Sequence, residues 1–193
     1  MTGSLKLVLA SSSPRRRELL ARLGVTPDRT VSPNIDETPR KAEKPRAYAL
    51  RMAEEKAAAI SREDGEIIIA GDTTVAVGRR ILQQAADEDM QRGFLNLLGG
   101  RRHHVLSAVC VVDTRGRARS RISDSVVRFK RLSDAEIDAY VVSSEGLGKA
   151  GGYAIQGRAE ALIDWMSGSH SGVIGLPLYE TRALLRAAGY PLD

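Results

Sequence analysis

A short segment near the N-terminus combines side chains that bind anions. The segment Ser11–Arg16, with the sequence SSSPRR, follows an apolar stretch, and Pro14 stands where the first turn of a helix would begin. The free N–H groups and positive dipole end of a helix favour an anion. Arginine donates two parallel hydrogen bonds to phosphate and keeps its charge. We therefore expect a phosphate clamp here; the alternative is a helix start whose arginines face water.

Two acidic positions offer ligands for a cation. Asp72 follows the apolar run 66–70, at the carboxyl end of a predicted strand, where α/β sheets commonly present ligand-binding groups. An aspartate there can hold a divalent cation or take a proton from an attacking water; the alternative is an Asx residue that forms a turn. Asp36 and Glu37 form a second pair in a predicted loop, with solvated side chains as the alternative. Because Mg²⁺ commonly uses one or two carboxylates together with phosphate oxygens and water, one residue from each position would suffice.

The glycine-rich segment 146–157 is a third candidate. Its glycines suggest close approach of the backbone to a ligand. Lys149 and Gln156 add a charge and an amide, and a glutamine can pair with the edge of a nucleotide base. The alternative is a set of plain turns.

Three other reactive side chains are not expected to do chemistry. His103 and His104 are adjacent in a predicted strand, so they would point to opposite faces and cannot form a helix-type metal pair. Cys110 lies within an apolar run and has no other cysteine to pair with, so we interpret it as a buried strand residue.

The composition favours a globular protein that binds small anions. With 193 residues, of which 42% are hydrophobic, we expect a single domain over 1–193. No stretch approaches the run of about 18 apolar residues that spans a bilayer, and no secretory signal is recognisable, so we expect a cytoplasmic protein without a membrane partner. The net charge of +5 is scattered and only 4% of residues are aromatic, which argues against a nucleic-acid partner.

The elements that must position these residues alternate between strand and helix. The N-terminal half is predicted to contain a strand at 5–9, a helix from Pro14 that stops at Gly24, a strand at 29–33, a loop at 34–45 and a helix to about Arg62. A strand at 66–70, a turn at Gly71–Thr74 and a hairpin at 75–82 around Gly78 should follow.

The C-terminal half contains clear helix-capping and hairpin patterns. We expect a helix from Asp87 to Leu98, antiparallel strands at 103–114 and 119–130 with polar outer faces, a helix opened by the capping box at Ser133, a strand at 161–165 and a final helix after Pro177. The alternation of elements indicates an α/β fold with a mixed sheet.

Taken together and in this order, the motifs resemble those of the Maf family of nucleoside triphosphate pyrophosphatases, also described as septum formation inhibitor proteins. The resemblance covers nearly the whole chain. It is carried by LASSSPRR at 9–16, IDET at 35–38, AEEKA at 53–57, DT at 72–73, GRRH at 100–103, KAGGYAIQG at 149–157 and GLPL at 175–178.

The resemblance implies a fold and an activity. The fold would be an elongated mixed β-sheet flanked by helices, with two lobes and a central cleft, of the Maf/ITPase-like type, usually in a homodimer. The activity would be hydrolysis of a nucleoside triphosphate, ordinary or modified, between its α- and β-phosphates with a divalent cation, Mg²⁺ or Mn²⁺. The products would be the monophosphate and pyrophosphate.

The resemblance also implies roles for single residues. Asp72 would be the general base, and Glu37 would join it at the metal or water. Phosphate-binding positions would be Ser11, Arg15, Arg16 and Lys56, with Lys149 as a further substrate contact. Positions linked to substrate choice would be Arg15, Thr73 and Gln156, and the sequence Ile155–Gly157 looks like that of the branch acting on dTTP and UTP.

Two positions depart from the family pattern. Gln84 stands where a lysine is expected, which removes one cationic contact to phosphate, and Gly148 stands where many members carry an aspartate. The first departure leaves open a non-catalytic nucleotide-binding regulator of cell division that retains the fold. The intact Arg15, Lys56 and Asp72 favour the enzyme. A nucleic-acid-binding module, recognisable by steeply salt-dependent binding, is a third alternative.

Overall fold

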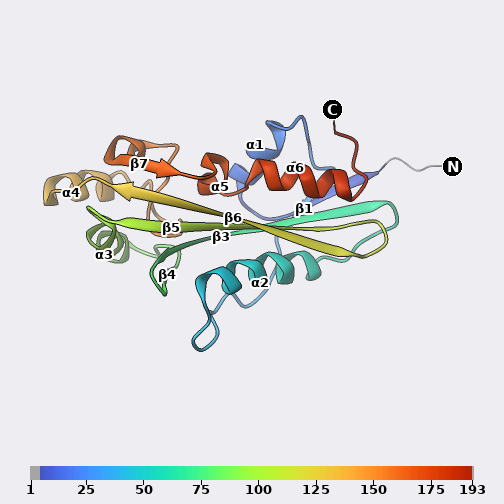
Figure 1. Ribbon diagram of the computed structural model, residues 1–193, viewed down its shortest axis with the longest axis horizontal. Coiled ribbons are helices and arrows are strands. Elements are labelled where there is room, and N and C mark those ends of the chain that lie inside the picture. The colour runs from blue at the N-terminus through green and yellow to red at the C-terminus, as the bar shows by residue number, and fades with distance from the viewer. Residues whose placement is uncertain (1–4, 193) are drawn as a thin grey trace.

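One mixed sheet organises the chain, which a computed structural model describes over residues 5–192 (Figure 1). Its strands are β1 (Lys6–Ala10), β2 (Arg29–Val31), β3 (Glu66–Val77), β4 (Arg80–Leu82), β5 (Arg102–Val112), β6 (Ala118–Phe129) and β7 (Ile163–Ser167). The order across the sheet is β2-β1-β3-β5-β6-β7, with β4 paired to β3. β1 runs parallel to β2 and β3, and the other pairs are antiparallel. The predicted α/β class with a mixed sheet is confirmed.

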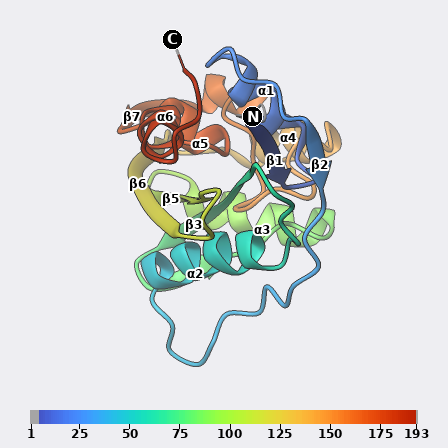
Figure 2. The same cartoon turned by 90° about the vertical axis from the view of Figure 1, so that its right-hand side faces the viewer.

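Helices cover both faces of this sheet. They are α1 (Pro14–Ala21), α2 (Pro45–Ala58), α3 (Glu88–Leu98), α4 (Asp134–Val142), the 3₁₀ helix η1 (Arg158–Leu162), α5 (His170–Ile174) and α6 (Leu178–Ala187). α2 lies on one face, whereas α1, α5 and α6 lie on the other (Figures 1 and 2). α3 and α4 contact each other at the end of the long strands that is opposite the β5–β6 turn. Within residues 5–192, no helix has both the length and the apolar character needed to cross a bilayer.

Local signals in the sequence predict several element ends correctly. The Asp87 carboxylate accepts a hydrogen bond of 2.8 Å from the backbone N–H of Met90, which caps α3. Ser133 and Glu136 form both halves of the capping box at the start of α4. Gly78 has a φ of 58° between β3 and β4, as a tight hairpin requires.

The turn predicted at Gly71–Thr74 is wrong, because β3 runs without interruption through it. β5 pairs with β3 along this stretch, with Asp72 opposite Ala108. A long antiparallel partner therefore overrides the local turn preference of glycine and aspartate. The Asx-turn alternative for Asp72 is excluded by the same pairing, and Asp72 lies in the middle of a buried strand.

The polar outer face predicted for the strand at 103–114 is also wrong. β5 is buried on both sides from Val105 to Val111, because α2 packs on one face and α5 and α6 pack on the other. The partner strand β6 alternates between buried and exposed positions over much of its length, as predicted. His103 is buried and the His104 side chain is half exposed, so they do point to opposite faces, and Cys110 is buried as expected.

Candidate active site

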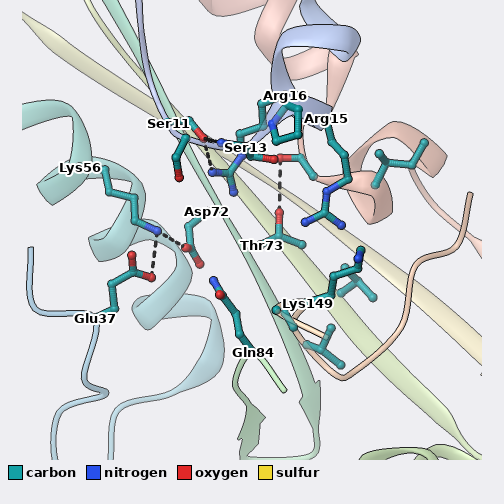
Figure 3. A pocket seen from close by; sticks show the side chains of 18 of the residues that line it. Ser11, Ser13, Arg15, Arg16, Glu37, Lys56, Asp72, Thr73, Gln84 and Lys149 are labelled. Atoms are coloured by element: carbon teal, nitrogen blue, oxygen red, sulfur yellow. Dashed lines mark hydrogen bonds and ion pairs between the residues drawn. The ribbon is translucent and has the colours of Figure 1, made fainter. Parts of the chain in front are cut away.

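A cavity of about 370 Å³ lies beside the middle of β3 (Figure 3). This volume falls within the range of about 300 to 1,000 Å³ that is typical of small-molecule sites. The β1–α1 loop, the β2–α2 loop, the segment 148–153 and the end of α5 also line it, together with Lys56 of α2, Gln84 after β4 and Val105 of β5. Among the predicted site residues, those that line the cavity are Ser11, Arg15, Arg16, Glu37, Lys56, Asp72, Thr73 and Lys149.

Glu37, Lys56 and Asp72 form one side of the cavity, which we call the carboxylate wall. Lys56 Nζ lies 2.8 Å from Asp72 Oδ1 and 3.1 Å from Glu37 Oε2. The side chains of Lys56 and Asp72 are each 8% exposed, whereas that of Glu37 is 45% exposed. Thr74 donates a further hydrogen bond of 2.9 Å to Asp72 Oδ2. Because each oxygen of Asp72 has a donor, the carboxylate is held in one orientation.

The sequence of α2 places Lys56 at this wall. Residues four apart lie above one another on a helix, so Tyr48, Met52 and Lys56 form one row, and all three are buried. The adjacent row of Ala49, Ala53 and Ala57 packs on the sheet. Lys56 therefore reaches Asp72 from a buried helix face, with its apolar stem covered and its ammonium in the ion pair.

Ser11, Arg15, Arg16 and Lys149 form the opposite side, which we call the basic wall. Arg16 Nη1 donates to Ser11 Oγ at 3.0 Å, and Arg16 Nε donates to the carbonyl oxygen of Gly175 at 2.9 Å. The Arg16 guanidinium thus joins two loops that are far apart in sequence. Burial lowers the pKa of Arg16, and the negative charge of Asp72 opposes that effect.

Arg15 and Lys149 extend towards each other across the basic wall (Figure 3). Burial lowers the pKa of both groups, and the positive charge of Arg15 further lowers that of Lys149. Lys149 Nζ donates to the backbone carbonyl oxygen of Glu145, which is a neutral acceptor. Because two partly buried cations repel each other, an anion bound between them would be strongly favoured.

Comparison of the whole sequence with known proteins shows the family of the chain. The family described as Maf-like protein matches residues 6–188. The chain belongs to this family. A protein of Sphingopyxis alaskensis named dTTP/UTP pyrophosphatase is 65% identical over 96% of this chain and 98% of its own. One of Novosphingobium aromaticivorans with the same name is 58% identical over 95% and 92%.

A likeness to solved structures is weaker. The Staphylococcus aureus Ham1 protein aligns with this Maf-like chain at a TM-score of 0.44 and 16% identity, over 64% of this chain and 71% of that one. The membership therefore rests on the sequence match.

Gln84 and Gly148, the two positions at which the resemblance predicts other residues, both line the cavity. The amide of Gln84 points towards the Asp72 carboxylate (Figure 3). The backbone of Gln84 also forms an isolated β-bridge with Ala150, next to Lys149 in the chain. A neutral amide thus lies between the two walls of this Maf-like site.

Of the three residues that the resemblance links to substrate choice, Arg15 and Thr73 line the cavity and Gln156 does not. Thr73 lines the cavity, and its hydroxyl lies 3.4 Å from the carbonyl oxygen of Gly175 and 3.3 Å from Ser107 Oγ. Gln156 is exposed and does not line the cavity. The structure therefore brings Thr73, but not Gln156, together with the other predicted site residues.

Sequence reasoning missed Tyr153 as a cavity residue. Tyr153 lines the cavity, and its hydroxyl lies 2.7 Å from Nε2 of the buried His103. Burial, the larger cause, and the charge of His104 lower the pKa of His103 to about 4, so the imidazole is neutral near pH 7. The glycines around Tyr153 indicate close approach of the backbone to a ligand but predict no role for the tyrosine. No local pattern connects Tyr153 with His103, which is 50 residues away.

The donor atoms of the carboxylate wall fit a hard divalent cation. Glu37 and Asp72 direct carboxylate oxygens to one point, which already holds the positive charge of Lys56. Within residues 5–192, no three histidine, cysteine, aspartate or glutamate side chains cluster as a complete metal site. Two carboxylates suit Mg²⁺ or Mn²⁺ only when phosphate oxygens and water complete the coordination.

Proposed function

We propose that this Maf-like protein is an enzyme that hydrolyses dTTP and UTP between the α- and β-phosphates, releasing the monophosphate and pyrophosphate. The observation that carries the proposal is the meeting, in one cavity, of a basic wall and the buried Asp72–Lys56 pair. The two similar proteins named dTTP/UTP pyrophosphatase, which align with nearly the whole chain, support the choice of nucleotide.

The basic wall would bind the triphosphate. Arg15 and Lys149 both line the cavity, where an anion could reach them. Burial and the charge of Arg15 lower the pKa of Lys149, and a bound anion would oppose both effects. Arg16 is held by Ser11 and Gly175 before any ligand arrives. Preorganised donors of this kind stabilise the charge that develops on the leaving pyrophosphate without a reorganisation cost.

Asp72 would accept the proton of the attacking water. The water oxygen forms a bond to phosphorus, the bridging P–O bond breaks, and the bridging oxygen leaves with pyrophosphate. Lys56 and Thr74 fix both Asp72 oxygens, so the carboxylate needs no rotation to receive the proton.

Glu37 and Asp72 would hold Mg²⁺ or Mn²⁺ together with phosphate oxygens and water. When bound, the cation would supply further neutralisation of the triphosphate charge. Thr73 would contact the substrate inside the cavity, whereas the exposed Gln156 would meet only a part of the nucleotide that extends beyond the cavity lining.

The test is hydrolysis of a panel of nucleoside triphosphates with Mg²⁺ or Mn²⁺, with monophosphate and pyrophosphate both measured. We expect turnover of dTTP and UTP, and we expect Asp72→Asn to lower kcat by about 10²- to 10⁴-fold. Asp124→Asn is the matched control, since this exposed aspartate pairs with His104 outside the cavity and should not affect kcat. Tight nucleotide binding by the unmodified chain with no products would instead support the non-catalytic regulator.

A further inference from the structure

Glu37 is carried by a long loop without regular secondary structure. This Glu37 loop, residues 32–44, connects β2 to α2 and extends away from the sheet beyond α2 (Figure 2). The carboxylate oxygen Oε2 of Glu37 nevertheless lies 3.1 Å from Lys56 Nζ. A loop of this kind needs contacts of its own to hold one residue at an exact place, because its backbone makes no strand or helix ladder.

Arg51 of α2 supplies several of those contacts. Its Nε and Nη2 donate to the two carboxylate oxygens of Glu43 at 2.7 and 2.6 Å. Nη2 also lies 3.2 Å from the carbonyl oxygen of Thr38, and Nη1 lies 3.1 Å from Glu55 of the same helix. One guanidinium therefore contacts both the residue after Glu37 and the far end of the loop.

Further hydrogen bonds hold the loop to α2 and to itself. Tyr48 donates from its hydroxyl to the carbonyl oxygen of Glu37 at 2.8 Å. Arg40 donates to Glu55 at 3.0 Å, and its backbone N–H donates to Glu43 at 2.9 Å. The loop is thus attached to α2 at Glu37, Thr38, Arg40 and Glu43.

The pair of Arg51 and Glu43 is largely buried. Their side chains are 13% and 10% exposed, and the hydrogen bonds from Arg51 lower the pKa of Glu43 to about 2. A bidentate, largely buried pair fixes geometry as well as charge. The chain has a second pair of this type, Arg29 with Glu66, whose nitrogen and oxygen atoms lie 2.9 and 2.8 Å apart. That second pair joins β2 to β3 and does not touch the Glu37 loop.

We propose that Arg51, through Glu43 and the Thr38 carbonyl, is a positioning residue that holds Glu37 against Lys56 and Asp72. The helix α2 then contributes to the site through two residues, Lys56 and Arg51. Lys56 reaches the carboxylate wall from the buried face, and Arg51 secures the loop that brings the second carboxylate to it. The consequence for catalysis rests on the proposed function, whereas the attachment of the loop does not.

A double-mutant cycle in the full chain separates positioning from general stability. If Arg51 acts through Glu37, Arg51→Met should lower kcat/KM for UTP about tenfold in the native background and less than about twofold in a Glu37→Gln background. Equal losses in both backgrounds would overturn the proposal. Arg29→Met is the matched control, and it should lower Tm while leaving kcat/KM unchanged in either background. Arg51→Lys, which keeps a charge but lacks the planar fork, replaces Arg51→Met if that variant does not fold.

Limited trypsin digestion tests the loop attachment without any activity measurement. Arg40 and Lys41 are exposed within the Glu37 loop. Cleavage there should be accelerated about tenfold by Arg51→Met, and by Glu43→Gln to a lesser degree, because local opening becomes easier. Arg29→Met should not accelerate it beyond any change in global unfolding. Unchanged cleavage in Arg51→Met would overturn the inference, whereas a chain that hydrolyses no nucleotide but shows accelerated cleavage would overturn only the proposed function.

Discussion

On the carboxylate wall every charge has a partner inside the protein, whereas on the basic wall the cations bond mainly to neutral oxygens. Lys56 lies between Asp72 and Glu37. Among residues 5–192, no salt bridge to a carboxylate is found for Arg16 or Lys149, and their hydrogen bonds go to a hydroxyl and backbone carbonyls. On the first wall two carboxylates share the ammonium of Lys56 before any ligand binds, whereas the cations of the second wall gain a negatively charged partner only when an anion binds.

The two walls should therefore respond oppositely to the loss of a cation. Removal of a lysine from a compensated buried pair leaves carboxylates without a partner, which destabilises the fold. Removal of a lysine from a group of mutually repelling cations relieves repulsion and desolvation, so the fold should not suffer and only anion binding should weaken.

The largest expected effect is that of Lys56→Met. The buried Asp72 would lose its ion-pair partner, so the free energy of unfolding should fall by about 3 kcal/mol. Urea denaturation followed by circular dichroism measures it. Mg²⁺ or Mn²⁺ should restore part of the loss, because a cation can take the place of the ammonium between the carboxylates. A loss below about 1 kcal/mol would mean that the pair is solvated and that the two walls do not differ in this way.

A smaller effect is expected from Lys149→Met. KM for UTP should rise about tenfold through the loss of one charged contact, with kcat and Tm little changed. Steady-state kinetics and a thermal melt measure the three quantities. A clear fall in Tm would show that Lys149 has an internal partner after all.

The pH dependence of KM, compared between the native chain and Lys149→Met, tests whether the charge of Lys149 favours substrate binding. Burial lowers the pKa of Lys149 from 10.5, so the ammonium is charged at low pH and loses its proton before 10.5 is reached. KM of the native chain should therefore rise as pH increases towards that value, and the rise should be smaller in Lys149→Met. The penalty of holding this charge in the folded state disappears over the same rise in pH.

The smallest effect is expected from Gln84→Lys, which places a cation between the walls. An added lysine at a partly open position is worth up to about 1 kcal/mol, so KM for UTP should fall about threefold. Titration of nucleotide binding with and without Mg²⁺ is the measurement. Weaker binding would indicate that repulsion from Lys56 and Lys149 outweighs attraction to phosphate, and that the native glutamine limits the positive charge at this site.

Features fixed by neighbouring residues could be predicted from the sequence. The caps at Asp87 and Ser133 were predicted because the bonding atoms lie within three residues of each other. The β5–β6 hairpin was predicted because two long runs, interpreted as alternating, flank Arg115 and Gly116, and the antiparallel pairing is confirmed. The roles assigned to the site residues and the homodimer come from the resemblance and remain predictions.

Features that depend on distant residues could not be predicted. The turn predicted at Asp72 is wrong because the partner of Asp72 in the sheet, Ala108, is distant in the sequence. The bond from Arg16 to the Gly175 carbonyl spans 159 positions and uses a backbone atom that every residue possesses. The exposure of Gln156 depends on how its loop packs, which glycine spacing does not reveal.

The continuous pairing of β3 should make local opening of the backbone rarer at Asp72 than at Glu37. Asp72 pairs with Ala108 inside the long antiparallel ladder of β3 and β5, so the backbone at this position should open rarely, with the sheet around it. Glu37 lies in a loop whose amides can exchange through local openings, which are far more frequent. The base of the proposed reaction therefore keeps its place for as long as the protein stays folded, while the second carboxylate leaves and returns many times in that interval.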